Sequence, residues 1–177
     1  MYKYRAFGYV ISSEFPILQI QPANDEDDVD IRIIRSDLRF LNIESIGFSS
    51  KNSIMLLNIP HLSDFRVTNG NLIEVDPFEG YSESRLAVFL LGSCMGAIMH
   101  QRDCMLIHGS CVTNGEYSII ISGQSGAGKS TTASEFLAHG WKLVTDDVSK
   151  IENGKMYCSY CGTEARLIPD YSELEDE

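Results

Sequence analysis

The stretch SGQSGAGKSTTASEF, residues 122–136, contains residue types at a spacing that can hold a phosphate group. It satisfies the pattern GxxxxGK[ST] with Gly123, Gly128, Lys129 and Ser130. The glycines let the backbone curl until successive N–H groups point inward and form a nest for an anion. The lysine ammonium can reach the β- and γ-phosphates of a nucleotide, and the serine hydroxyl can bind Mg²⁺. The stretch predicts a loop that binds ATP with Mg²⁺; the alternative is a glycine-rich turn with an exposed lysine.

The expected elements on either side of this loop support the interpretation. The apolar run YSIII, residues 117–121, predicts a strand buried on both faces. A helix is expected from Lys129 to Ala138, with Gly140 after its end. The start of such a helix presents free N–H groups and a positive dipole end to an anion. We therefore expect one contiguous nucleotide-binding set, namely Gly123, Gln124, Ser125, Gly126, Ala127, Gly128, Lys129, Ser130 and Thr131.

Two adjacent carboxylates follow the helix. The run WKLVTDD, residues 141–147, predicts a second buried strand that ends in Asp146 and Asp147. A carboxylate at the carboxyl end of a parallel strand beside a phosphate loop can hold Mg²⁺ or accept a hydroxyl proton. Because one helix and one strand fill the short separation from Lys129, we expect this strand next to the loop strand. The expected metal ligands are Ser130, Asp146 and Asp147, and the alternative is a solvated strand end.

His108, in the run LIHGS, is the third candidate for chemistry. It precedes Gly109, where the strand expected over CMLIHGSCV, residues 104–112, should bend. At a strand end, a histidine could donate to a phosphate or tune an acidic base. The alternative is a structural hydrogen-bonding histidine.

The remaining elements predict an α/β fold in two parts. Residues 1–81 are β-rich, with a tight hairpin at Asn69-Gly70, and residues 82–177 hold the phosphate loop. A helix is expected from Ser82 to about Gln101. Its apolar part, residues 86–100, is too short to span a bilayer, and its glycines predict close packing on a sheet.

Composition excludes some partners. The chain has 177 residues, 44% of them hydrophobic, and a formal charge of −11. A field of this sign repels nucleic acid and anionic membranes, so we expect neither as a partner. The acidic run QPANDEDDVD, residues 21–30, concentrates charge and turn-forming residues and predicts a solvated loop. Calcium binding is not expected there, because the glycine and terminal glutamate of an EF-hand loop are missing.

The cysteines predict the cellular compartment. The five cysteines are irregularly spaced and odd in number, and the chain does not open with a signal peptide, so we expect free thiols and a cytoplasmic protein. Cys158 and Cys161 have the spacing of a zinc knuckle. No second pair completes a four-ligand site, so we expect neither zinc nor redox chemistry there.

Taken together, these residues are similar to a known family. HGSCV and ISGQSGAGKSTTASEFLAHGWKLVTDDVSKI, over about residues 98–152, resemble the HPr serine kinase/phosphorylase family. That family shows a His-Gly, the phosphate loop and a Leu-Val-x-Asp-Asp strand in this order. FGYVISSEFPI and HQRDCMLIHGS resemble its smaller relatives, some of which phosphorylate lasso-peptide precursors. The resemblance implies a phosphate-loop core of the type found in phosphoenolpyruvate carboxykinase.

The resemblance also implies roles for the site residues. Lys129 and Ser130 would bind phosphate and Mg²⁺, and Asp147 would take the proton from an acceptor serine. Asp146 would support it, and His108 would lie near the transferring phosphate. The implied reaction moves the ATP γ-phosphoryl group to a serine of a peptide or small protein, and a homo-oligomer is an expected assembly. The alternatives are a nucleotide-sensing module without catalysis and a small-molecule kinase.

Two departures from the family pattern stand in this sequence. Thr131 occupies a position where the bifunctional enzymes usually have Glu, and phosphorolysis activity stays open. ARLIPDYSELEDE, residues 165–177, resembles only the beginning of the region that follows the Asp-Asp strand in the smaller relatives. A fragment, a natural short form and a domain completed by another chain stay open as interpretations.

Overall fold

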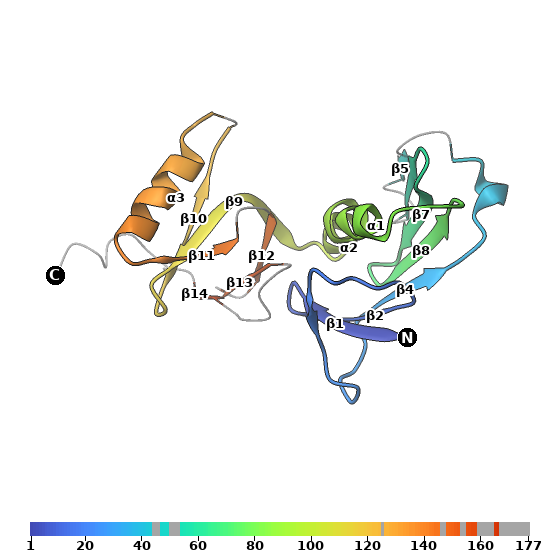
Figure 1. The fold of residues 1–177 in the computed structure, drawn as a ribbon, viewed down its shortest axis with the longest axis horizontal. Helices are drawn as coiled ribbons and strands as arrows, with labels where there is room; N and C mark the ends of the chain where they lie inside the picture. The colour runs from blue at the N-terminus through green and yellow to red at the C-terminus, as the bar shows by residue number, and fades with distance from the viewer. Residues whose placement is uncertain are drawn as a thin grey trace.

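The computed structural model describes residues 1–43, 47–49, 54–124, 126–145, 148–152, 155–158 and 165–166. The described residues form two β-sheets and a few helices, which confirms a mixed α/β fold (Figure 1). Predictions for Ser125, Asp146-Asp147, Asn153-Gly154 and Cys161 concern residues outside these ranges, and so does most of the C-terminal run.

The first sheet is built from the N-terminal part of the chain, in the strand order β3-β1-β2-β4-β8-β7-β6-β5. Phe7-Gly8 and Asn69-Gly70 join two of its hairpins with positive φ angles of 53°, 77°, 56° and 65°. Positive angles at both turn positions define the tight turn that matches strand twist, so the hairpin predicted at Asn69-Gly70 is confirmed. The strands are β1 (Tyr2–Ala6), β2 (Tyr9–Ser13), β3 (Gln21–Pro22), β4 (Ile31–Arg35), β5 (Gly47–Ser49), β6 (Ile54–Ile59), β7 (Ser63–Thr68) and β8 (Leu72–Pro77), with a short 3-10 turn, η1 (Arg39–Leu41).

A helical segment packs on this sheet. The Ser82 hydroxyl accepts from the Arg85 N–H and caps α1 (Glu83–Phe89). A π-helical turn, η2 (Leu90–Cys94), leads directly into α2 (Met95–Gln101). Side chains from α1, η2 and α2 share one buried core with β1, β2, β4, β6, β7 and β8. The helix expected to open the second part of the chain is therefore packed against the first sheet, and the division at residues 81 and 82 stays a prediction.

The helix glycines do not make the close contacts expected of them. A Cβ added at Gly92 or Gly96 would meet nothing within 4 Å. The helix packs instead through its larger apolar side chains, which include the fully buried Leu90 and Ile98. No helix in the described part of the chain is long and apolar enough to cross a membrane.

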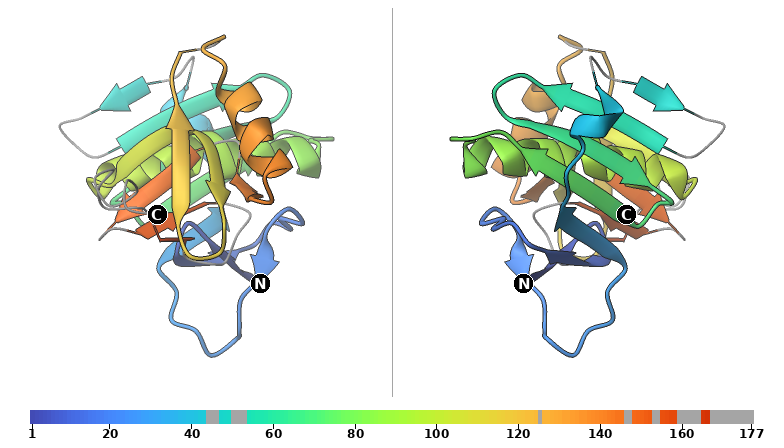
Figure 2. Two further views of the ribbon diagram at one scale, coloured as in Figure 1. Left: turned by 90° about the vertical axis from the view of Figure 1, so that its left-hand side faces the viewer. Right: turned by 90° about the vertical axis from the view of Figure 1, so that its right-hand side faces the viewer.

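The second sheet is organised around its longest strand. Strand β9 pairs with β10 along one edge and with both β11 and β12 along the other, always antiparallel. Helix α3 lies beside β9, β10 and β11 (Figure 2, left). The elements are β9 (Met105–Thr113), β10 (Ser118–Ser122), α3 (Lys129–Ala138), β11 (Lys142–Thr145), β12 (Val148–Glu152), β13 (Lys155–Tyr157) and β14 (Ala165–Arg166).

Two predictions about burial and neighbours are wrong. Strand β10 is an edge strand and only half-buried, and β11 is largely exposed, with Leu143 at 49%. The reason is that α3 buries only Ala133, so it covers little of the sheet. The strand that follows the loop helix lies next to β9 and not next to the loop strand, because β9 lies between them and pairs with one on each edge.

Candidate functional site

The glycine-rich loop connects the end of β10 to the start of α3. Gly126 and Gly128 have φ angles of +82° and +87°, a region that L side chains rarely adopt. Gly128 is the N-cap residue, and α3 runs from Lys129 to Ala138 as predicted. Gly140, at φ +89°, follows the helix end, which confirms the predicted stop. The pattern thus produces a strand, a glycine turn and a helix whose first N–H groups face the loop.

Lys129 folds back over the beginning of the loop. Its ammonium donates to the carbonyl oxygens of Gly123, at 2.9 Å, and Gln124, at 3.0 Å. Both partners are neutral, so the positive charge has no carboxylate to compensate it in these contacts. An anion that enters the loop can exchange for these carbonyls, because a charged acceptor makes the stronger hydrogen bond.

Ser130 and Thr131 stand on the first turn of α3, and both are exposed. The Ser130 carbonyl accepts from the Ser134 hydroxyl at 2.8 Å, which ties the first helical turn to the second. Ser130 is thus placed one residue after Lys129 on a regular helix. Among the described residues, no group of three or more His, Cys, Asp or Glu side chains is placed to hold a metal ion.

His108 lies on β9, beside the strand end that leads into the loop. The Ser122 hydroxyl donates to the His108 carbonyl at 2.9 Å, and Ser122 pairs across the strands with Gly109. A Cβ at Gly109 would lie 2.4 Å from the Ile121 carbonyl oxygen, so the close approach of the two strands requires glycine there. Strand β9 continues through Gly109 as one strand, Met105–Thr113, and the expected bend at Gly109 stays a prediction. The exposed His108 side chain is held on a backbone anchored to the loop strand.

Asp146 and Asp147 lie outside the described residues, but the residues on either side of them are described. Thr145 ends β11 opposite Cys111, and Val148 begins β12 opposite His108. Strand β9 therefore connects the loop strand on one edge to both flanks of the Asp-Asp pair on the other. The structure brings His108, Ser122 and Val148 to one region of the sheet, across neighbouring strands.

The structural roles of Ser122 and Gly109 at this place were not predicted from the sequence. Ser122 precedes the first motif glycine, and its hydrogen bond to His108 depends on strand register. Gly109 is explained by the approach of Ile121 and not by a turn. Register between antiparallel strands is a long-range property, so a local pattern does not reveal either role.

The cysteines near the sheet are structural in the described part of the chain. Cys111 is fully buried, and burial raises the pKa of its thiol to about 12, so it is protonated at neutral pH and a poor nucleophile. Cys94, Cys104 and Cys111 are free. Cys158 is disulfide-bonded, so the prediction of free thiols is wrong for this residue.

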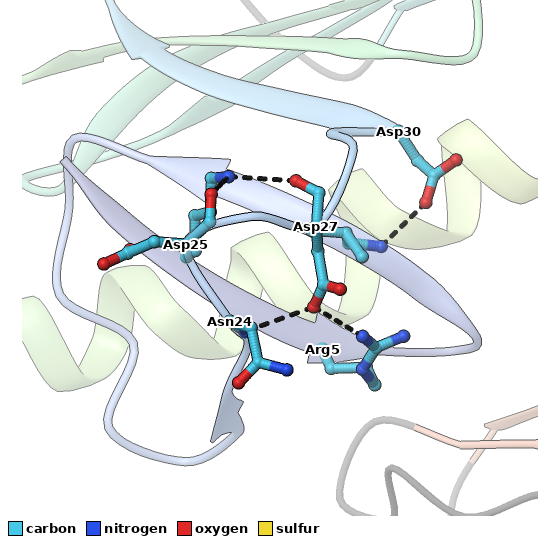
Figure 3. Close-up of polar contacts among 7 residues, drawn as sticks. Arg5, Asn24, Asp25, Asp27 and Asp30 are labelled. Carbon is cyan, nitrogen blue, oxygen red and sulfur yellow. Dashed lines mark hydrogen bonds and ion pairs between the residues drawn. The ribbon is translucent and has the colours of Figure 1, made fainter.

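Two other features are not part of this site. A pocket of about 220 Å³ is lined by Phe136 and Trp141 together with Thr132, Glu135 and His139. Most of its lining lies on the later turns of α3 and beyond, whereas the loop meets the first turn. The acidic loop at 21–30 is braced internally: Asp27 accepts from Arg5 and from the Asn24 N–H (Figure 3). Its carboxylates fold the loop, in agreement with a solvated loop.

A comparison with protein-family models relates the C-terminal part of the chain to a known domain. Residues 101–175 match the model of the HPr Serine kinase C-terminal domain. The match contains the loop, α3 and the strands of the second sheet, and it confirms the resemblance seen in the sequence. It covers less than half of the chain, and residues 1–100 lie outside it. No curated protein and no solved structure matches the chain.

Proposed function

We propose that the chain is an ATP-dependent kinase of the HPr serine kinase type, which transfers a γ-phosphoryl group to a serine hydroxyl of a peptide or small protein. The observation that carries the proposal is the family match over residues 101–175, which contains the glycine loop and the HPr kinase-like residues on either side of it. The position of the Lys129 ammonium over the loop carbonyls of Gly123 and Gln124 supports it.

In this mechanism the loop N–H groups and the Lys129 ammonium hold the phosphates. Ser130, Asp146 and Asp147 are the residues that would bind Mg²⁺, which supplies charge neutralisation at the transferring phosphate. Positioning and electrostatics carry most of the catalysis in phosphoryl transfer, because the protein has little covalent chemistry to perform.

Asp147 is the proposed base for the acceptor hydroxyl, and His108 is a proposed donor to the phosphoryl oxygens. The pairing of Val148 with His108 supports a shared site for them, since Val148 directly follows Asp147 in the chain. A cytoplasmic protein, a homo-oligomer and a protein acceptor belong to the same proposal; the acidic surface disfavours nucleic acid.

The test is transfer of labelled γ-phosphate from ATP to an arrayed library of serine-containing peptides. The wild-type chain should label a subset of them in the presence of Mg²⁺. Asp147→Asn should keep the ATP affinity measured in EDTA within about threefold of wild type and lower transfer by about 10² or more, because it removes a general base. Serine labelling that survives Asp147→Asn undiminished contradicts the base assignment. ATP binding by the wild type without transfer to any peptide would favour a nucleotide-sensing module.

A further inference from the structure

The turn between β1 and β2 docks on the second sheet (Figure 1). The Phe7 N–H donates to the Cys158 carbonyl at 2.9 Å. Gly8, at φ +77°, lies against the Tyr157 ring, and a Cβ there would lie 2.6 Å from a ring carbon. Glycine is therefore favoured at this contact, because L side chains rarely adopt this backbone angle and the Tyr157 ring occupies the space that a Cβ would need.

Lys150 on β12 lies at the centre of this contact. Its side chain is 1% exposed, and its ammonium lies 4.1 Å from the Tyr9 ring centroid and 4.4 Å from that of Tyr157. One carboxylate, from the half-exposed Glu152, accepts from it at 3.1 Å. Burial of a lysine is costly unless partners compensate its charge. Two aromatic faces and one carboxylate supply that compensation and hold the side chain in one place.

Tyr9 is itself anchored to the chain that enters β9. The Arg102 guanidinium lies 4.6 Å from its ring centroid, and its hydroxyl lies 3.4 Å from the Cys104 sulfur. Both partners belong to the segment between α2 and β9. Tyr9 therefore contacts β12 through Lys150 and the start of β9 through Arg102 and Cys104.

The strand register connects this contact to the proposed site. Lys150 pairs with Leu106 on one side and Tyr157 on the other, and Val148, two residues earlier, pairs with His108. Val148 is the first residue of β12 and directly follows Asp147. Because Lys150 lies only two residues after Val148 on the same strand, contacts that hold Lys150 also hold β12 close to the Asp-Asp pair.

We propose that Lys150 is a positioning residue, which with Tyr9, Tyr157 and the Phe7-Gly8 turn clamps β12 to the N-terminal sheet and holds the chain at Val148 in place for Mg²⁺ binding by the preceding aspartates. The inference depends on the proposed function, because it assigns the N-terminal sheet a task in the phosphotransfer site. A residue that only filled space between the sheets would leave Mg²⁺ binding unchanged.

The experiment uses Lys150→Met and Gly8→Ala in the full chain. Met keeps the length of the side chain and packs well against aromatic rings, so the fold is retained while the charge is lost. Gly8→Ala introduces the clash with Tyr157. The controls are Lys142→Met, at an exposed position of β11, and Gly80→Ala, at φ +75° with nothing within 4 Å of its Cβ.

Two measurements are made on each variant: ATP affinity in EDTA and in Mg²⁺, and amide exchange of peptides over residues 148–152. In both test variants the ATP affinity in EDTA should stay within twofold of wild type. The gain in ATP affinity on adding Mg²⁺ should be at least fivefold smaller than in wild type. Amides of β12 should exchange at least fivefold faster. The controls should match wild type. If the test variants keep both the Mg²⁺-dependent gain in ATP affinity and the exchange rate of wild type, the proposed clamp is wrong. If β12 exchanges faster but the gain in affinity is unchanged, the positioning role of Lys150 is wrong.

The outcomes for the two proposals are distinguishable. If the wild type binds Mg²⁺–ATP more tightly than ATP but phosphorylates no peptide, the proposed kinase activity fails, and the Mg²⁺ gain in the variants still decides the clamp. If the wild type shows no Mg²⁺ gain, both the aspartate ligands and the positioning role of Lys150 are overturned.

Discussion

Lys129 and His108 stand on either side of the place where the loop strand ends. Lys129 points its charge at loop carbonyls, and His108 extends from a strand whose backbone is bonded to Ser122. Neither residue by itself indicates a phosphate-binding site. With Lys129 at the start of α3 and His108 on β9, a phosphate bound in the loop would meet both a nest of N–H groups and charged or polar donors at its edge.

At this scale, His108→Gln tests the proposed donor. Gln keeps polarity but does not place an N–H donor where the imidazole ring does, so transfer to the peptide library should fall by about 10² while ATP affinity changes less than about threefold. His139→Gln is the control, since His139 is exposed at the far end of α3. Equal transfer by the two variants would remove His108 from the site.

At the scale of elements, the antiparallel pairing of β9 with β10 depends on one glycine. In Gly109→Ala the new Cβ would meet the Ile121 carbonyl at 2.4 Å, a backbone atom that cannot rotate away. Overpacking of this kind should lower the free energy of unfolding by about 1–3 kcal/mol, as measured by urea denaturation.

A matched substitution gives the control for that prediction. Gly96→Ala in α2 adds the same methyl group where nothing lies within 4 Å of it. It should raise the free energy of unfolding by about 0.5–1 kcal/mol, because Ala has a higher helix propensity than Gly. If Gly109→Ala has the same free energy of unfolding as wild type, β9 and β10 do not approach as closely at Gly109 as the structure shows.

The elements also show what the sequence could predict. The loop and α3 follow from a local pattern, because Gly128 must take a positive φ and Lys129 begins the helix. The hairpin at Asn69-Gly70 is local in the same sense. The place of β9 between the loop strand and β11 is not, because antiparallel register depends on residues far apart in the chain.

The candidate site divides in the same way. The glycines, Lys129 and Ser130 could be predicted from their spacing alone, whereas the anchoring of His108 by Ser122 could not. Lys150 carried no signal, since a lysine in an alternating strand ordinarily faces solvent. Its burial depends on Tyr9, which lies in another sheet.

At the scale of the whole molecule, the two sheets have unequal cores among the residues that the structure describes. There the first sheet and its helices enclose a large cluster of buried apolar residues, whereas the second encloses Cys111, Met156 and Cys158, with Ile120 and Val144 partly buried. Stability follows buried apolar area, so the two halves should differ in local opening.

Hydrogen exchange measures this difference. Amides of β7, β8 and α2 should exchange at least tenfold more slowly than amides of α3 and β11 in the free protein. Saturating Mg²⁺–ATP should slow exchange in α3 and leave β7 unchanged, because a ligand stabilises the unit that binds it. Uniform protection across both sheets would contradict the unequal cores.

The most direct measurement of the central claim is a calorimetric titration of ATP with Mg²⁺ into the 177-residue chain and into its Lys129→Ala variant. Ala removes the only side-chain charge placed over the loop carbonyls in the described structure, so affinity should fall at least 100-fold. Lys142→Ala, on the exposed face of β11, should bind as wild type does. Equal ATP affinity in wild type and Lys129→Ala would contradict the assignment of the glycine loop as the phosphate site.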